Sequence, residues 1–260
     1  MERLELAEQI QTLRREREHT GIFLDFDGTL APIVEDREAA AIVPEAPEIL
    51  SSLSRLYKLV AFISGRGAAD LYPRVGADGP RYLGLYGAEE MTPEGLVQSP
   101  MAGRWRQTAK TLAGQAAEVI RANDLAGCDV ENKDLAVSLH YRNSGLPEPP
   151  PPLAAWARDA ASRTGFTLGV GRMVLELKPP SVSKASAFQR LAVQAQVQNA
   201  LVAGDDAADV EMMRRAAHLI PGLLLRVGVV STEAPAGMLE VTDLQVKSPA
   251  EVVELLERLL

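Results

Sequence analysis

The chain is poor in the residues that build disulfides and metal clusters. Its 260 residues contain one cysteine, Cys128, and three histidines. A single cysteine forms neither an intrachain disulfide nor a cysteine-based metal cluster. His19, His140 and His218 are too widely spaced to form a zinc motif. These absences exclude a disulfide-stabilised scaffold and indicate a reducing compartment.

An excess of positive charge is also lacking. The chain has 27 basic and 35 acidic residues, a formal net charge of −8. Nucleic acids and anionic membranes are bound by basic surfaces, so neither is expected as the main partner. A phosphorylated substrate is still compatible with this charge, because a divalent cation and a few local basic residues can supply the attraction.

Long hydrophobic runs are missing as well. The longest apolar stretch, residues 219–230, is interrupted by Pro221, Gly222 and Arg226, so we expect no membrane span. Residues 1–18 are rich in Glu and Arg and lack the apolar core of a signal peptide. We therefore expect a cytoplasmic protein.

Most of the chain alternates between short apolar runs and amphipathic segments. This alternation predicts an α/β fold with a doubly wound, parallel, Rossmann-like sheet. The expected strands are residues 21–26, 59–63, 82–85, 200–203 and 223–227, and the expected helices are 44–57, 184–196, a segment from 209, and 249–260.

The middle of the chain has a different pattern. A long helix is predicted over residues 103–123, followed by strands at 127–133 and 135–142. The proline run 147–152 is interpreted as a stiff connector to a helix at 153–163, with two more strands at 166–170 and 172–177. We interpret this α-β-β-α-β-β unit, residues 97–178, as a small α/β cap domain inserted into a core formed by 1–96 and 179–260.

The stretch Asp25-Phe26-Asp27-Gly28-Thr29-Leu30 directly follows an apolar strand pattern. A strand period of two places Asp25 and Asp27 on the same side as the chain leaves the sheet. Gly28 permits a turn that most residues cannot make. Two neighbouring carboxylates repel each other, so the pair implies a raised pKa on one of them or a bound cation.

Three further groups lie where loops leave expected strands or where helices begin. They are Ser64-Gly65-Arg66, Lys184 after the helix cap Ser183, and Gly204-Asp205-Asp206-Ala207-Ala208-Asp209. A hydroxyl, backbone N–H groups and a lysine suit phosphate oxygens, although an ordinary turn and a solvated lysine are the competing interpretations. Asp205 and Asp209, four residues apart, can project toward one point. Ligands that are all oxygen favour Mg²⁺.

The expected cap presents a polar face. Alternation places Ala136, Ser138, His140 and Arg142 on one side of the first of two cap strands, and Arg172, Val174, Glu176 and Lys178 on the corresponding side of the other. A mixture of donors and acceptors suits a polyol. Simple exposure to solvent is the alternative interpretation.

Taken in order, the four core groups resemble the signature of the haloacid-dehalogenase-like phosphohydrolase superfamily. The resemblance implies that Asp25 attacks phosphorus to form an aspartyl-phosphate and that Asp27 acts as general acid and then base. It implies that Ser64, Gly65 and Lys184 bind the phosphoryl group. It also implies an Mg²⁺ site formed by Asp25, Asp205 and the main chain of Asp27, with Asp206 and Asp209 orienting metal-bound water or Lys184.

Within that superfamily the chain resembles the trehalose-6-phosphate phosphatases. The matching stretches are residues 24–33, Ser64-Gly65-Arg66, Glu131-Asn132-Lys133, His140-Tyr141-Arg142, 175–180 up to Lys184, and Gly204-Asp205-Asp206. The resemblance implies that the sugar is bound by Arg66, Lys133, His140, Arg142, Glu176 and Lys178. The chain departs from the family pattern at Tyr86-Gly87, where His-Gly is usual, and at Ala208-Asp209-Val210, where Thr-Asp-Glu is usual.

These observations lead us to expect a monomeric sugar-phosphate phosphatase. Trehalose 6-phosphate is the favoured substrate, which would place the reaction in trehalose biosynthesis. Sucrose phosphate or a glycosyl-3-phosphoglycerate is an alternative substrate, and a sugar phosphomutase with the same core is an alternative enzyme. A catalytically silent sugar-phosphate sensor is the alternative from a different functional class.

Overall fold

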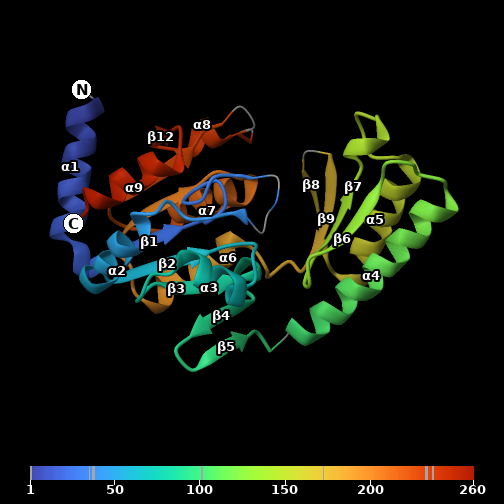
Figure 1. The fold of residues 1–260 in the computed structure, drawn as a ribbon, viewed down its shortest axis with the longest axis horizontal. Coiled ribbons are helices and arrows are strands. Elements are labelled where there is room, and N and C mark those ends of the chain that lie inside the picture. The colour runs from blue at the N-terminus through green and yellow to red at the C-terminus, as the bar shows by residue number, and fades with distance from the viewer. Residues whose placement is uncertain are drawn as a thin grey trace. The chain divides into compact units, whose positions relative to one another are not determined.

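A computed structural model of the chain describes residues 2–34, 36, 39–100, 102–171, 173–231, 234–235 and 237–260. The chain divides into two compact units. The first consists of Met1–Val97 and Ser183–Leu260, and the second is Gln98–Val182. Figure 1 shows the elements of each unit by label.

The first unit is built on a sheet in the strand order β12-β11-β10-β1-β2-β3-β4-β5. Neighbouring strands from β12 to β3 pair in parallel, and β4 runs antiparallel to β3. The strands are β1 Thr20–Leu24, β2 Leu59–Ile63, β3 Arg81–Gly84, β4 Glu89–Thr92, β5 Gly95–Gln98, β10 Asn199–Gly204, β11 Leu224–Val229 and β12 Leu244–Val246.

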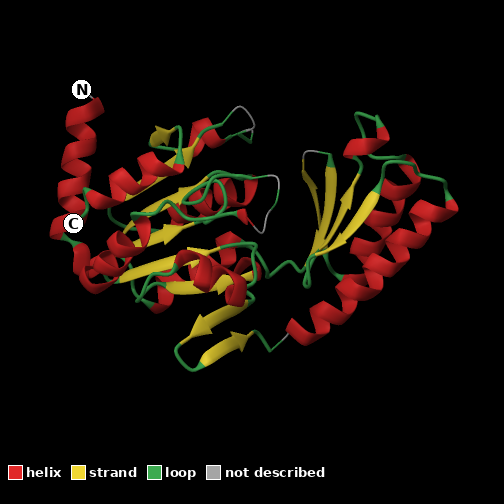
Figure 2. Cartoon of the chain, in the orientation of Figure 1, coloured by secondary structure: helices red, strands yellow, loops and turns green. Residues whose placement is uncertain are grey.

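Helices cover both faces of this sheet (Figure 2), as the strand sequences require. In β1, Ile22 and Leu24 pack into the core on one face, while Phe23 packs into the core on the other. Because both faces are buried, the central strands are continuously apolar. The first face is covered by α1 Glu2–Arg15, α2 Ala46–Leu56, α3 Ala68–Val75 and α9 Pro249–Glu257, and the second by α6 Lys184–Gln194, α7 Ala207–Leu219 and α8 Met238–Val241.

The second unit is an antiparallel sheet in the order β6-β7-β9-β8 with two helices on one face (Figure 2). Its elements are α4 Ala102–Ala122, β6 Asp129–Asn132, β7 Val137–His140, α5 Pro151–Thr164, β8 Thr167–Gly171 and β9 Val174–Lys178. Val137, Leu139, Leu175 and Leu177 point toward the helices and form their shared core. The polar residues of the same strands are therefore left on the opposite face.

Several boundaries differ from the sequence-based expectations. The first strand ends at Leu24 rather than at residue 26, so Asp25 and Asp27 lie in the following loop and do not share a strand face. The connector interpretation of the proline run was wrong for Pro151 and Pro152, which begin α5. Proline is tolerated there because the first N–H groups of a helix have no intrahelical partner.

Some elements were not expected at all. The short strands β4 and β5, the helix α3 and the strand β12 had no clear sequence signal. The α3 sequence contains Pro73, which argues against a helix interior, and β5 is largely exposed, which hides its strand pattern. Arg172, which the sequence placed on the polar face of a cap strand, lies outside the described residues.

Candidate active site

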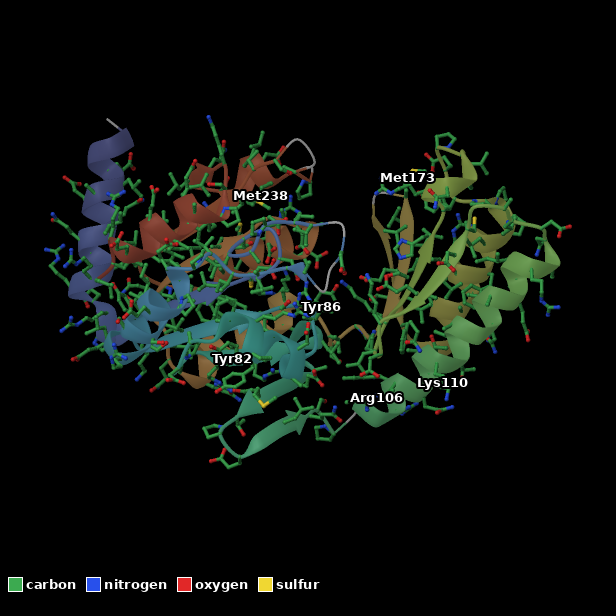
Figure 3. All side chains as sticks on the ribbon, in the orientation of Figure 1. Tyr82, Tyr86, Arg106, Lys110, Met173 and Met238 are labelled. Atoms are coloured by element: carbon green, nitrogen blue, oxygen red, sulfur yellow. The ribbon has the colours of Figure 1, made fainter. Side chains whose placement is uncertain are left out.

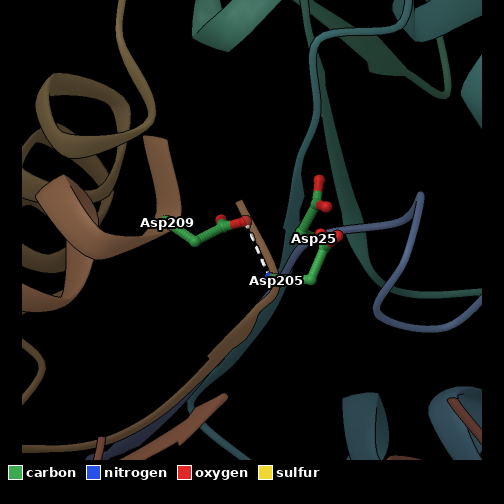
Figure 4. Close-up of side chains that lie close together, drawn as sticks. All are labelled: Asp25, Asp205 and Asp209. Atoms are coloured by element: carbon green, nitrogen blue, oxygen red, sulfur yellow. Dashed lines mark hydrogen bonds between the residues drawn. The ribbon is translucent and has the colours of Figure 1, made fainter. Parts of the chain in front are cut away.

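Three carboxylates meet at the carboxyl ends of neighbouring parallel strands. Asp25 follows β1, Asp205 follows the adjacent strand β10, and Asp209 lies in the first turn of α7. One oxygen atom from each of the three lies within 4.8 Å of the others, and Figure 4 shows the group. This edge is where open α/β sheets place their ligand sites.

The carboxylates of Asp25 and Asp205 are placed where negative charge is unfavourable. Burial raises the pKa of Asp25 to about 6. The pKa of Asp205 is raised to about 8, mainly by burial and secondly by the negative charge of Asp25. A positive charge near two carboxylates with raised pKa values would stabilise their ionised forms. All-oxygen donors fit a hard divalent cation such as Mg²⁺.

Asp209 organises the loop that carries Asp205. Its Oδ2 accepts the N–H groups of Asp205 at 3.1 Å and Asp206 at 3.2 Å, and the residue is fully buried. Asp206 is the N-cap of α7 and accepts the N–H of Asp209 at 2.9 Å. The two residues form a reciprocal capping box. Asp209 thus has protein donors of its own, and Asp25 and Asp205 are better suited to hold a cation.

Lys184 connects this loop to Asp25. It is the first residue of α6, after the N-cap Ser183, and is 1% exposed. Its Nζ lies 2.9 Å from Asp25 Oδ1, 2.9 Å from Asp209 Oδ2 and 3.4 Å from Asp206 Oδ1. Burial alone would lower the pKa of Lys184, but these three carboxylates outweigh burial and raise the pKa well above its usual value. Lys184 is therefore a buried, charged ammonium and not a solvated surface lysine.

Asp27 has a different partner from Asp25. Arg66 binds it through two parallel hydrogen bonds, Nε to Oδ2 and Nη2 to Oδ1, each 2.7 Å long. Arg66 also bonds Asp70 at 3.0 Å, packs 5.5 Å from the ring centroid of Phe26 and is 2% exposed. Hydrogen bonding to Asp27 raises the pKa of Arg66. The guanidinium thus fixes the orientation of the Asp27 carboxylate.

The loop after β2 offers a hydroxyl and a backbone donor. Ser64 is buried, and its Oγ accepts the N–H of Arg66 at 3.1 Å. This bond uses the oxygen as acceptor, so the Ser64 hydroxyl keeps its hydrogen for a ligand. The N–H of Gly65 has no acceptor among the described residues. These two groups suit a phosphate oxygen.

Gly28 allows the backbone to pass directly beside the cluster of carboxylates. Its φ of +79° is left-handed, and a Cβ at this position would lie 2.1 Å from Oδ2 of Asp205. The Gly28 N–H donates to the carbonyl of Ala31 at 2.7 Å, which closes the turn. The turn after Asp27 and the position of Asp205 therefore depend on each other.

The second unit carries a separate network of charges on its polar sheet face. Glu176 forms ion pairs with Lys133, at 3.5 Å, and with Lys178, at 3.8 Å. His140 Nε2 lies 3.1 Å from Glu131 Oε2, which is 3.7 Å from Lys133 Nζ. Four of the residues expected to bind sugar thus lie on one face, joined by Glu131, which the sequence reasoning had not selected. The strand period of two in β6 could have placed Glu131 on this polar face, because it pairs with Ser138 of β7.

Arg142 is placed differently from the other expected cap residues. The strand β7 ends at His140, and Arg142 begins the 3-10 turn Arg142–Ser144, where it is exposed. It therefore does not continue the alternation of the strand. Asp70, the second carboxylate on Arg66, was also missed, because a helix position four residues beyond Arg66 carries no distinctive motif.

Comparison with known proteins gives a family match over most of the chain. The family model for trehalose-phosphatase matches residues 23–233. A trehalose-phosphate phosphatase of Mycobacterium leprae is 35% identical over 181 residues, covering 67% of this chain and 41% of that protein. One of Mycobacterium tuberculosis is 38% identical over 160 residues, covering 61% of this chain and 40% of that protein. The chain spans less than half the length of these curated relatives.

Solved structures share the fold. A trehalose-6-phosphate phosphatase of Aspergillus fumigatus superposes with a TM-score of 0.71 at 23% identity, covering 97% of this chain and 96% of that one. The C-terminal domain of a trehalose-6-phosphate phosphatase of Candida albicans gives a TM-score of 0.69 at 21% identity, with the same coverage of both chains. None of the described helices has the length and apolar character needed to cross a bilayer.

Proposed function

The chain belongs to the trehalose-phosphatase family, and from this premise we propose that it hydrolyses trehalose 6-phosphate to trehalose and phosphate. The observation that carries the proposal is the group formed by the buried Asp25 and Lys184 and the half-buried Asp205 at the carboxyl edge of the parallel sheet. Family membership supports the class of reaction, and the charges of this group suit a phosphate ester.

Asp25 is the proposed nucleophile. Its carboxylate attacks phosphorus, the bond to the sugar oxygen breaks, and the phosphoryl group is transferred to Asp25. Water then attacks phosphorus and releases phosphate, which regenerates the carboxylate. Lys184, 2.9 Å from Asp25, offsets the repulsion between an anionic nucleophile and an anionic substrate. Ser64 and the Gly65 N–H are the proposed donors to the phosphoryl oxygens.

Asp27 is the proposed general acid and base. It gives a proton to the departing sugar oxygen and later accepts one from the attacking water. We propose that Arg66, which is buried and bonded to Asp27 and Asp70, acts on the substrate through Asp27 rather than by contact with the sugar. Its two hydrogen bonds to Asp27 fix the orientation of the carboxylate.

Mg²⁺ is the proposed cofactor. Asp25 and Asp205 would hold it, together with the main-chain carbonyl of Asp27, while Asp206 and Asp209 hold the loop and Lys184 in place. When bound, the cation supplies positive charge that stabilises the phosphoryl group during transfer. The chemistry of the donors supports this choice, because they are all oxygens and the pKa values of Asp25 and Asp205 are both raised.

The inserted unit, expected over residues 97–178, is the proposed sugar-recognition element. Lys133, His140, Glu176 and Lys178 provide adjacent donors and acceptors on one sheet face, which suits a polyol. Arg142 is kept as a proposed sugar ligand on the family resemblance alone. Cytoplasmic location and a monomeric state are likewise proposals from the sequence.

A phosphate-release screen tests this function. The full chain is assayed with Mg²⁺ against trehalose 6-phosphate, sucrose 6-phosphate, glucosyl-3-phosphoglycerate and glucose 6-phosphate. We expect the highest kcat/KM with trehalose 6-phosphate and no turnover after removal of divalent cations with EDTA. Equal rates on all sugars would contradict the substrate assignment, and full activity in EDTA would contradict the cation requirement.

A further inference from the structure

The loop after β3 has an unusual backbone. Leu85 has a φ of +48° and Tyr86 a φ of +57°, and Gly87 follows with +90°. Positive φ is uncommon for any side chain and an outlier for a bulky one. Residues held in such conformations gather at functional sites, where the surrounding structure fixes them. An aromatic residue here therefore calls for an explanation beyond the turn itself.

The hydrogen bonds of this loop tie it to the predicted phosphate loop. The N–H of Leu85 donates to the carbonyl of Arg66 at 2.8 Å, and the N–H of Tyr86 donates to the carbonyl of Ser64 at 2.8 Å. On the other side, Arg190 Nη2 donates to the carbonyl of Gly87 at 2.9 Å. Tyr86 is thus held in register with residues 64–66.

The hydroxyl end of the Tyr86 ring lies against Gly65. A Cβ built on Gly65 would be 2.9 Å from both Cζ and Oη of Tyr86, and 3.2 Å from Cε1. Tyr86 is half-buried, and Figure 3 labels it at the end of the core sheet where the strands β1, β2 and β3 finish. The phenol oxygen therefore lies beside the residue whose N–H is available to a ligand.

We infer that Tyr86 is an additional phosphate-binding residue, whose phenol O–H donates to a phosphoryl oxygen of the bound ester. The inference rests on the proposed function, because the ligand is the phosphoryl group of its substrate. A phenol is a neutral donor at pH 7, so it adds a hydrogen bond to the group formed by Ser64, Gly65 and Lys184 without adding charge. In its left-handed conformation Tyr86 has this hydroxyl beside Gly65.

Tyr86→Phe keeps the ring and removes the hydroxyl. The probe is inorganic phosphate, measured with Mg²⁺ as a competitive inhibitor and by its stabilisation of the folded protein. One charge-assisted hydrogen bond corresponds to a weakening of phosphate binding by about 10- to 150-fold. We expect kcat/KM to fall by a similar factor on trehalose 6-phosphate and on an aryl phosphate, with Tm unchanged. Tyr72→Phe, at an exposed tyrosine of the same unit, should change none of these values.

Tyr86→Gly separates this role from packing. Glycine adopts positive φ without strain, which offsets the packing lost with the ring, so we expect a Tm close to that of the unmodified chain together with weakened phosphate binding. Unchanged phosphate affinity in Tyr86→Phe, or a lowered Tm with unchanged phosphate affinity in Tyr86→Gly, would overturn the inference. Failure of the unmodified chain to hydrolyse trehalose 6-phosphate while it still binds phosphate would contradict the proposed substrate and leave the role of Tyr86 intact.

Discussion

Replacing Gly28 with alanine is expected to disable the site without disrupting the fold. A Cβ at Gly28 would lie 2.1 Å from Asp205 Oδ2, whereas real Cβ contacts essentially never fall below 3.0 Å. The carboxylate of Asp205 or the turn at residue 28 must therefore shift, and their separation must grow by at least the difference, 0.9 Å. A misplacement of about 1 Å in an active site can cost roughly 10²-fold in rate. We expect Gly28→Ala to lose at least that factor in kcat/KM.

The matched control is Gly76→Ala. Gly76 has a φ of +63° in the same unit, and a Cβ there would have the carbonyl oxygen of Pro73, at 3.9 Å, as its nearest neighbour. Both substitutions place alanine in a left-handed conformation at a cost of about 1–2 kcal/mol. Only Gly28→Ala adds the collision with Asp205. The two variants should therefore differ much more in activity than in stability.

The assay is phosphate release at several Mg²⁺ concentrations, alongside thermal unfolding. Gly28→Ala should require more Mg²⁺ for half-maximal activity than Gly76→Ala. Asp205→Asn, which introduces no collision, provides a second route to the same loss if Gly28→Ala unfolds. Activity of Gly28→Ala within about threefold of Gly76→Ala would refute the reasoning, since the expected separation is roughly 10²-fold.

Three further predictions concern the acid, the cation and the sugar. Asp27→Asn should lower kcat by roughly 10²–10⁴-fold on the sugar phosphate and less on an aryl phosphate. Arg66→Lys should lower kcat on its own but cause little further loss in the Asp27→Asn background. Additive losses of kcat in this double-mutant cycle would contradict positioning of Asp27 by Arg66. The pKa values of Asp25 and Asp205 are raised to about 6 and about 8, so the cation-free protein binds protons more tightly when folded and should lose stability as pH rises from 4 to 8. The Tm gain from Mg²⁺ should therefore be larger at pH 8.5 than at pH 6, and an equal gain at both pH values would contradict this. Glu176→Gln should lower kcat/KM about 10- to 150-fold on trehalose 6-phosphate and spare an aryl phosphate, and equal losses on both would exclude sugar recognition.

The core of the site could be predicted because its signals are local. The strand β2 and residues 200–203 of β10 are short, continuously apolar runs, and each strand ends directly before a loop that carries polar site residues. Parallel strands bring their carboxyl ends to one edge, so the proximity of Asp25 and Asp205 follows from topology. Lys184 could be expected near these carboxylates for the same reason, because it is the first residue of α6 and this helix begins at that edge.

Other features depend on contacts that sequence patterns do not encode. Arg66 and Asp27 are separated by 39 residues, and the tripeptide at 64–66 indicates only a turn, so their pairing was not expected. The hairpin of β4 and β5 is polar and partly exposed, which hides its strand character. Tyr86 was recognised as a departure from a family pattern, whereas its strained backbone and its contact with Gly65 required the structure.

The central claim is that Asp25 carries the phosphoryl group during hydrolysis. The direct measurement mixes trehalose 6-phosphate with excess protein and Mg²⁺, quenches the reaction in acid within milliseconds, and analyses the peptide containing Asp25 by mass spectrometry. The account predicts a peptide heavier by one phosphoryl group, which disappears as phosphate is released and is absent in Asp25→Asn. Rapid phosphate release with no modified peptide, or undiminished turnover by Asp25→Asn, would contradict it.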